Sequence, residues 1–150
     1  MRMITEAVQI LLIMVVLLRV ADLQEKLEEL DKKLDFILNT HHHNDHVGAN
    51  LKLQKKYNCI IVLKGQGTII CNKKEMYLCS SGGPELAVAG TGDILSGVIG
   101  SLIAQGLTPL DAAITGVGLH AQAGENFATK VGTIGLAASE LIPQIRKLLN

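Results

Sequence analysis

Aromatic residues are scarce in this chain of 150 residues: they make up 3% of it, and tryptophan is absent. A folded core must therefore be built from Leu, Ile, Val and Ala, and apolar residues in all make up 48% of the chain. Neither sign of charge is in excess, because Lys plus Arg and Asp plus Glu number 14 each. A nucleic-acid-binding surface, which needs a basic patch, is not indicated. The length suits one modest domain with a single core.

Cysteine is also rare in the sequence. Cys59, Cys71 and Cys79 are odd in number and lack the Cys-x-x-Cys spacing of redox and zinc motifs. This pattern indicates reduced thiols with structural roles, and it favours a cytoplasmic location.

Long apolar runs are missing except near the N-terminus, where residues 10–18 are unbroken. This run is shorter than the roughly 20 residues that a membrane-spanning helix needs. Arg2 before it is compatible with a signal peptide, but Glu6 lies in the charged region and no small-x-small cleavage site follows Leu18. We expect a buried strand or helix here and no membrane partner; a membrane-associated or non-native leader is the alternative.

The most informative stretch is 90–106, which begins Gly-Thr-Gly-Asp. Residues 90–92 predict a loop, and Asp93 is placed to begin a helix. The apolar face predicted for that helix consists of Ile94, Val98, Leu102 and Ile103. The free N–H groups and positive dipole end of a helix N-terminus attract anions, and glycines before it let a phosphate approach the backbone. Asp93 is then either a helix cap or a base beside a bound phosphate.

Residues 83–97, Gly-Pro-Glu-Leu-Ala-Val-Ala-Gly-Thr-Gly-Asp-Ile-Leu-Ser-Gly, resemble the signature of the ADP- or ATP-dependent NAD(P)H-hydrate dehydratases, members of the ribokinase-like superfamily. The resemblance continues through 102–106 and 118–124 and reaches back to 62–65, so that it covers about residues 58–150. It implies an α/β fold: a truncated ribokinase-like three-layer arrangement, in which helices flank a partial, mostly parallel sheet with a β-hairpin.

The same resemblance implies a function in the repair of nicotinamide nucleotides. The expected partners are hydrated NADH or NADPH as substrate and ADP or ATP with Mg²⁺; the nucleotide phosphorylates the ring hydroxyl, and elimination restores the dihydropyridine. Asp93 is the implied catalytic base, and the N–H groups of residues 90–92 would stabilise the transferring phosphoryl group. The implied nucleotide-binding residues are Lys64, Gly65, Gln66, Gly67, Thr68, Gly90, Thr91 and Gly92. The family also assembles, so a homo-oligomer is expected.

A histidine cluster forms a second motif. Residues 40–46, Thr-His-His-His-Asn-Asp-His, resemble the metal motif of the metallo-β-lactamase superfamily, and with 47–51 they look most like hydroxyacylglutathione hydrolase. The implied zinc ligands are His41, His43, Asp45 and His46. Such a site holds a hydroxide nucleophile between two metals. The family draws further ligands from later in its chain, where this sequence has a single histidine, His120.

The chain is therefore interpreted as two parts, 1–57 with the hydrolase-like fragment and 58–150 with the dehydratase-like part. Three functions stay open: hydrate repair, metal-dependent thioester hydrolysis, and a non-catalytic fusion remnant that binds nucleotide weakly. The predicted helices are 22–33, 50–57, one from Asp93, one from Pro109 capped by Thr108, and a last one capped by Ser139; the predicted strands are 35–39, 59–63 and a hairpin of 67–71 and 76–79. His120 is expected to be a hydrogen-bonded packing residue rather than a catalytic one.

Overall fold

The computed structural model describes residue 25, residues 28–29, residue 34, residues 36–39 and residues 50–150. Within this part, four strands form one sheet in the order β1 (Phe36–Asn39), β2 (Ile60–Leu63), β3 (Thr68–Cys71) and β4 (Met76–Cys79). β1 and β2 are parallel, whereas β2–β3 and β3–β4 are antiparallel. The described sheet is therefore mixed rather than mostly parallel, because the predicted hairpin makes up half of its strands.

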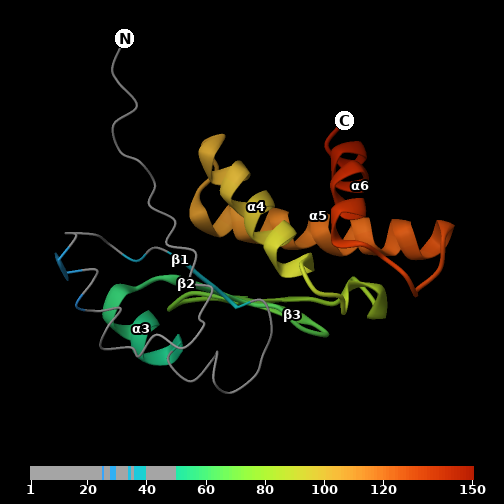
Figure 1. Cartoon of the computed structure of the whole chain (residues 1–150). Helices are drawn as coiled ribbons and strands as arrows, with labels where there is room; N and C mark the ends of the chain where they lie inside the picture. The colour runs from blue at the N-terminus through green and yellow to red at the C-terminus, as the bar shows by residue number, and fades with distance from the viewer. Residues whose placement is uncertain (1–24, 26–27, 30–33, 35, 40–49) are drawn as a thin grey trace, which may run out of the picture.

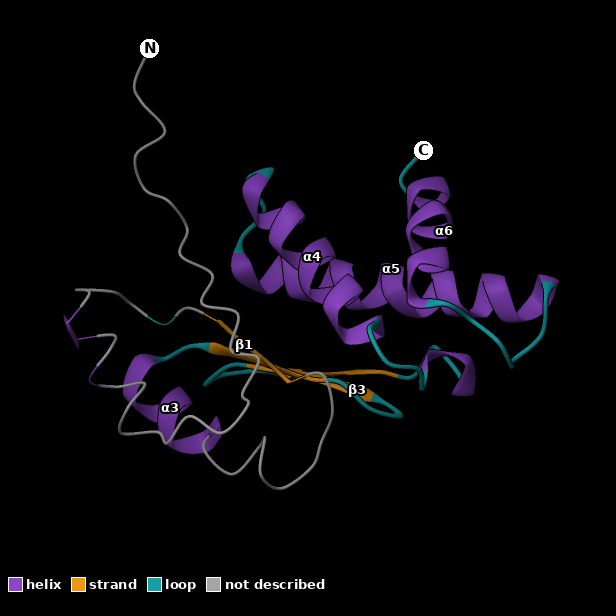
Figure 2. Cartoon of the chain, in the orientation of Figure 1, coloured by secondary structure: helices purple, strands orange, loops and turns teal. Residues whose placement is uncertain are grey.

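Helices cover both faces of this sheet, which confirms the predicted α/β layers (Figure 1). Figure 2 shows α3 on one side and the other three α-helices on the opposite side. The helices are α3 (Asn50–Tyr57), α4 (Thr91–Ala104), α5 (Pro109–Lys130) and α6 (Leu141–Leu148), with the short 3₁₀ turns η1 (Pro84–Leu86) and η2 (Ala138–Glu140).

The core follows from the alternation of side chains along the strands. Residues at every second strand position, such as Phe36, Val62 and Ile70, pack against α4 and α5. The residues between them, such as Ile37 and Ile61, pack on the α3 side with Leu34, Leu53 and Cys59.

Close contact between α4 and α5 depends on Gly116 of α5. A Cβ at this position would lie 2.6 Å from Ile99 Cγ1. The small residues of α5 therefore allow tight packing against α4, as predicted. Gly97 of α4 has no such role, because a Cβ there would meet nothing within 4 Å. The buried apolar residues of α4 are Leu95, Ile99, Leu102 and Ile103. The predicted Ile94 and Val98 are partly buried and pack against the core, whereas Leu95 and Ile99 were missed.

Helix starts were predicted with mixed success. Thr108 caps α5 as expected, since its side chain accepts a hydrogen bond from the Asp111 N–H, and Pro109 is the first helical residue. Ser139 is not the cap of the last helix: α6 begins at Leu141, after η2, and the Glu140 carboxylate accepts the Ala137 N–H at 2.7 Å.

Several predictions lie outside the described residues. These are the apolar run 10–18, most of the helix 22–33, and the proposed zinc ligands His41, His43, Asp45 and His46. Where the chain is described, none of its helices has both the length and the apolar character needed to cross a bilayer.

Candidate active site

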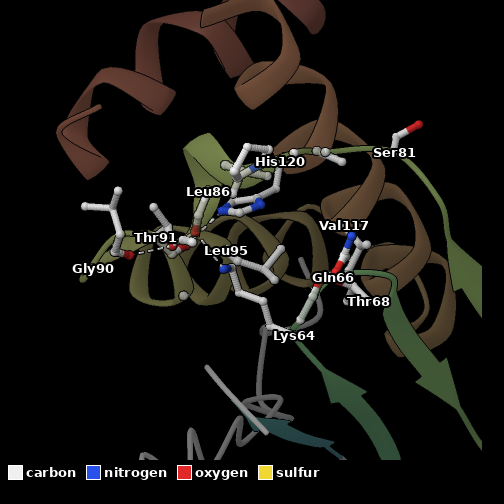
Figure 3. Close-up of a pocket in the computed structure, with 18 of the residues that line it drawn as sticks. Lys64, Gln66, Thr68, Ser81, Leu86, Gly90, Thr91, Leu95, Val117 and His120 are labelled. Carbon is white, nitrogen blue, oxygen red and sulfur yellow. Dashed lines mark hydrogen bonds between the residues drawn. The ribbon is translucent and has the colours of Figure 1, made fainter. Parts of the chain in front are cut away.

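A cleft of about 840 Å³ opens beside the sheet, at the end of β2. Four segments line it: the residues that follow β2, most of the connection from Ser81 to α4, the first turns of α4, and one face of α5 (Figure 3). Of the residues predicted to bind nucleotide or to catalyse, the structure places in its lining Lys64, Gly65, Gln66, Thr68, Gly90, Thr91, Gly92 and Asp93. Gly67 is the exception, since it lies in the adjacent turn and is not part of the lining.

The N-terminus of α4 supplies an unpaired donor to this cleft. Gly90 is the N-cap in a left-handed conformation (φ 87°), which glycine adopts without strain. The N–H groups of Asp93 and Ile94 both donate to the Gly90 carbonyl at 3.1 Å. Gly92 is buried, and no acceptor within the described residues bonds its N–H. A buried amide without an acceptor is uncommon, and at a helix start it is suited to an anion.

Asp93 lies in the first turn of α4, two residues after the helix begins at Thr91. The prediction that Asp93 begins the helix was therefore wrong, because Gly90 occupies the cap position. No side-chain cap hydrogen bond is formed at this terminus, and the Asp93 carboxylate accepts none from the residues described. The carboxylate is exposed at the cleft, where it is available to a ligand.

Lys64 brings a positive charge to the cleft beside the start of α4. Its backbone N–H donates to the Asn39 carbonyl at 3.0 Å, which ties it to the end of β1. Its Nζ donates to the Leu86 carbonyl at 3.0 Å (Figure 3). Burial lowers the pKa of Lys64 from its ordinary value.

His120 of α5 contacts the start of α4 from the neighbouring helix. It is 3% exposed, and its Nε2 lies 2.9 Å from the Thr91 carbonyl oxygen. The predicted hydrogen-bonded packing role is thus confirmed. Burial lowers the pKa of His120 to about 4, and the charge of Lys64 acts in the same direction, while the bond to Thr91 opposes them. The imidazole is therefore neutral at pH 7, and Nε2 carries the proton that the carbonyl accepts.

The loop of residues 81–83 also lines the cleft, and sequence reasoning did not assign it a site role. Glu125 of α5 holds this loop, because its Oε1 accepts the Gly82 N–H at 2.9 Å. Gly82 has φ 87°, and a Cβ on it would crowd Ala121 at 3.3 Å. The paired glycines at 82 and 83 were the available signal for a backbone that approaches a ligand.

Solved structures identify the fold. A ribokinase-like superfamily protein from Enterococcus faecalis V583 superimposes with a TM-score of 0.61 at 24% identity, over 82% of this chain and 48% of that one. The ADP/ATP-dependent NAD(P)H-hydrate dehydratase from Bacillus subtilis, co-crystallised with ATP/Mg²⁺, gives a TM-score of 0.66 at 22% identity, over 79% and 48%. The chain thus has a ribokinase-like α/β fold.

The sequence family described as NAD(P)H-hydrate dehydratase matches residues 26–147. The chain therefore belongs to the NAD(P)H-hydrate dehydratase family. It is 42% identical over 106 residues to the bifunctional NAD(P)H-hydrate repair enzyme of Vibrio cholerae, covering 71% of this chain and 22% of that protein. It is 39% identical over 108 residues to the ADP-dependent (S)-NAD(P)H-hydrate dehydratase of Neisseria meningitidis, covering 71% and 36%.

The chain thus spans between a fifth and about a third of the length of these relatives. The family match begins at residue 26, inside the segment that was compared with hydroxyacylglutathione hydrolase. The comparisons support the dehydratase resemblance and give no support to the hydrolase resemblance of residues 21–57.

Proposed function

We propose that this chain carries the nucleotide-binding and phosphoryl-transfer part of an ADP- or ATP-dependent NAD(P)H-hydrate dehydratase. The observation that carries the proposal is the buried Gly92 N–H, which has no acceptor among the described residues and opens onto a cleft next to the exposed Asp93 carboxylate. Phosphoryl transfer requires positioning and charge stabilisation, and this arrangement offers a donor for phosphate oxygens beside a proton acceptor.

In the proposed reaction, Asp93 takes the proton of the substrate's ring hydroxyl. The hydroxyl oxygen attacks the terminal phosphorus of the nucleotide, and the bond to the bridging oxygen breaks. Phosphate then leaves the ring, the neighbouring ring carbon loses a proton, and the double bond of the dihydropyridine forms. Gly92 and the neighbouring amides hold the charge on the transferred group, and the Lys64 ammonium adds a positive charge beside them.

Mg²⁺ is expected to enter with the nucleotide. Asp93 is the single acidic side chain in the cleft lining, and the described residues contain no cluster of three or more His, Cys, Asp or Glu. Mg²⁺ is commonly held by one or two carboxylates together with substrate phosphates and water. A single carboxylate beside a helix start that suits phosphate fits an ion held mainly by the nucleotide phosphates and water, and Asp93 then remains the proton acceptor. Zinc at the histidine cluster, self-association and a cytoplasmic location remain predictions from the sequence.

The proposal is tested by thermal unfolding of the full chain with and without ADP–Mg²⁺. A ligand that binds the folded form raises the midpoint, by about 2–4 °C for each kcal/mol of binding linkage in a protein of this size. Gly92→Trp should abolish the response because its side chain enters the cleft. Gly97→Trp is the matched control: it lies on the same helix, exposed, with open space around its Cβ position. If ADP–Mg²⁺ leaves the unfolding midpoint of the wild-type chain unchanged, the proposal is wrong.

Asp93→Asn separates binding from chemistry. We expect the midpoint shift with ADP–Mg²⁺ to survive, since asparagine preserves the shape of the side chain. The rate of NADH recovery from its hydrate should fall by about 10²–10⁴-fold, the usual loss when a general base is removed. Unchanged turnover in this variant would remove Asp93 from the mechanism.

A further inference from the structure

Four hydrogen bonds tie the floor of the cleft to the elements around it. His120 of α5 bonds the Thr91 carbonyl oxygen, the Thr91 hydroxyl reaches the carbonyls of Leu86 and Val88 at 2.9 Å each, and Lys64 also donates to the Leu86 carbonyl. Figure 3 shows Lys64, Leu86, Thr91 and His120 converging at this point. We propose that His120 is a positioning residue, which aims the Gly92 N–H at the ligand by holding the carbonyl of the same peptide unit.

The planarity of the peptide carries this inference. The carbonyl of Thr91 and the N–H of Gly92 belong to one planar trans unit, in which they point in opposite directions. A donor that fixes the carbonyl oxygen therefore also fixes the direction of the N–H. The first turn of a helix lacks the full set of backbone hydrogen bonds, so that an anchor from another element matters most there.

The same hydrogen bond also strengthens the Gly92 donor. When a carbonyl accepts a hydrogen bond, its amide becomes more polarised, and the N–H of the same amide becomes a better donor. This effect grows in a low dielectric. Both partners are buried, with His120 3% and Thr91 1% exposed. The effect would therefore act on the Gly92 N–H, the donor to phosphate in the proposed function.

The charge state of His120 agrees with this role. The pKa of about 4 keeps the ring neutral, and burial and the Lys64 ammonium both act against protonation. A neutral histidine adds no charge to the cleft, so its contribution comes through the peptide and not through direct attraction of phosphate. Lys64, which bonds the Leu86 carbonyl beside Thr91, is the side chain that can attract phosphate by its charge.

Three substitutions test the proposal, which rests on the proposed function of the cleft. Glutamine in His120→Gln can place an N–H near the position of Nε2, whereas His120→Asn ends near Nδ1 and His120→Leu has no donor. Phe127→Leu is a packing control, since Phe127 is buried on the same helix and does not line the cleft. The readouts are the dissociation constant for ADP–Mg²⁺ and, without ligand, the NMR amide shifts of Gly92.

We expect His120→Leu and His120→Asn to weaken ADP binding by tenfold or more and to shift the Gly92 amide signals. His120→Gln should stay within a few fold of the wild type, and Phe127→Leu should lower the unfolding midpoint without changing ADP affinity. If His120→Leu fails to fold, the comparison of His120→Asn with His120→Gln tests the inference. Wild-type affinity with unchanged Gly92 signals in His120→Asn would overturn the inference. A wild type that binds no ADP would overturn the proposed function, and the Gly92 signals would still test His120.

Discussion

Asp93 and His120 share one cleft but have opposite surroundings. Asp93 is exposed in the first turn of α4, and its carboxylate accepts no hydrogen bond from the residues described. His120 is buried and already bonded to the backbone. An available carboxylate can take a proton from a substrate, whereas a buried neutral imidazole with its Nε2–H engaged can only hold structure in place. The division of roles therefore follows from solvation and not from residue type.

Burial of a neutral His120 predicts that acid destabilises the fold. The folded-state pKa of about 4 lies below the ordinary value of 6.5, so between these values the unfolded chain binds more protons than the folded one. The free energy of unfolding should thus be fully retained above about pH 6.5 and should fall by on the order of 3 kcal/mol as the pH drops towards 4. Urea unfolding at about pH 7 and about pH 5 measures the first part of this loss, about 2 kcal/mol.

His120→Gln is the control for this prediction, because glutamine does not ionise in that range. The variant should retain only the part of the acid sensitivity that comes from other groups. Identical pH dependence in the two proteins would show that the His120 imidazole is accessible to protons in the folded state.

Most residues of the cleft were predictable from the sequence, but the start of α4 and the contact of His120 were not. The Gly-Thr-Gly-Asp motif located the turn correctly, yet an aspartate is favourable both at an N-cap and within the first turn, so the sequence could not place the helix start. The contact between His120 and Thr91 joins positions 29 residues apart. Only the packing of α5 on α4 brings them together, and no local pattern encodes that.

At the scale of elements, α5 is the scaffold of the cleft. It supplies His120 to the turn before α4 and Glu125 to the loop before η1, and it contacts α4 through Gly116. The orientation of this one helix therefore determines the positions of two walls of the site. A small change in the α4–α5 contact should therefore change the affinity of the cleft for its ligand.

Gly116→Ala tests the tightness of that contact. The new Cβ would lie 2.6 Å from Ile99 Cγ1, so that either the side chain or the helix must move. Overpacking of a core costs about 1–3 kcal/mol, which should outweigh the gain of up to about 1 kcal/mol in helix propensity. Urea unfolding should therefore show a less stable protein.

Gly118→Ala is the matched control on the same helix. Gly118 is exposed, and a Cβ there meets nothing within 4 Å. This variant should be more stable by about 0.5–1 kcal/mol, since only the helix propensity changes. Equal effects of the two substitutions would mean that Gly116 is not a packing constraint.

At the scale of the whole molecule, the structure connects the two parts that the sequence suggested. β1 pairs in parallel with β2 from across the predicted boundary at residues 57 and 58. The core on the α3 side combines Leu34, Ile37 and Leu53 with Cys59 and Ile61. The strands were visible in the sequence as short apolar runs, but the pairing of β1 with β2 was not, because strand order depends on contacts between distant segments.

Ile37→Ala tests whether these contacts make one cooperative unit. Ile37 is fully buried, and replacing such a residue by alanine costs about 2–5 kcal/mol. If the chain unfolds as one unit, the loss should appear in a single transition and should equally lower the midpoint measured by ADP binding at the cleft. Ile142→Ala on α6 is the control, since Ile142 is 48% exposed and should cost far less. Two separate transitions, with the ADP-binding one unmoved by Ile37→Ala, would instead establish that residues before 58 fold apart from the dehydratase-like part.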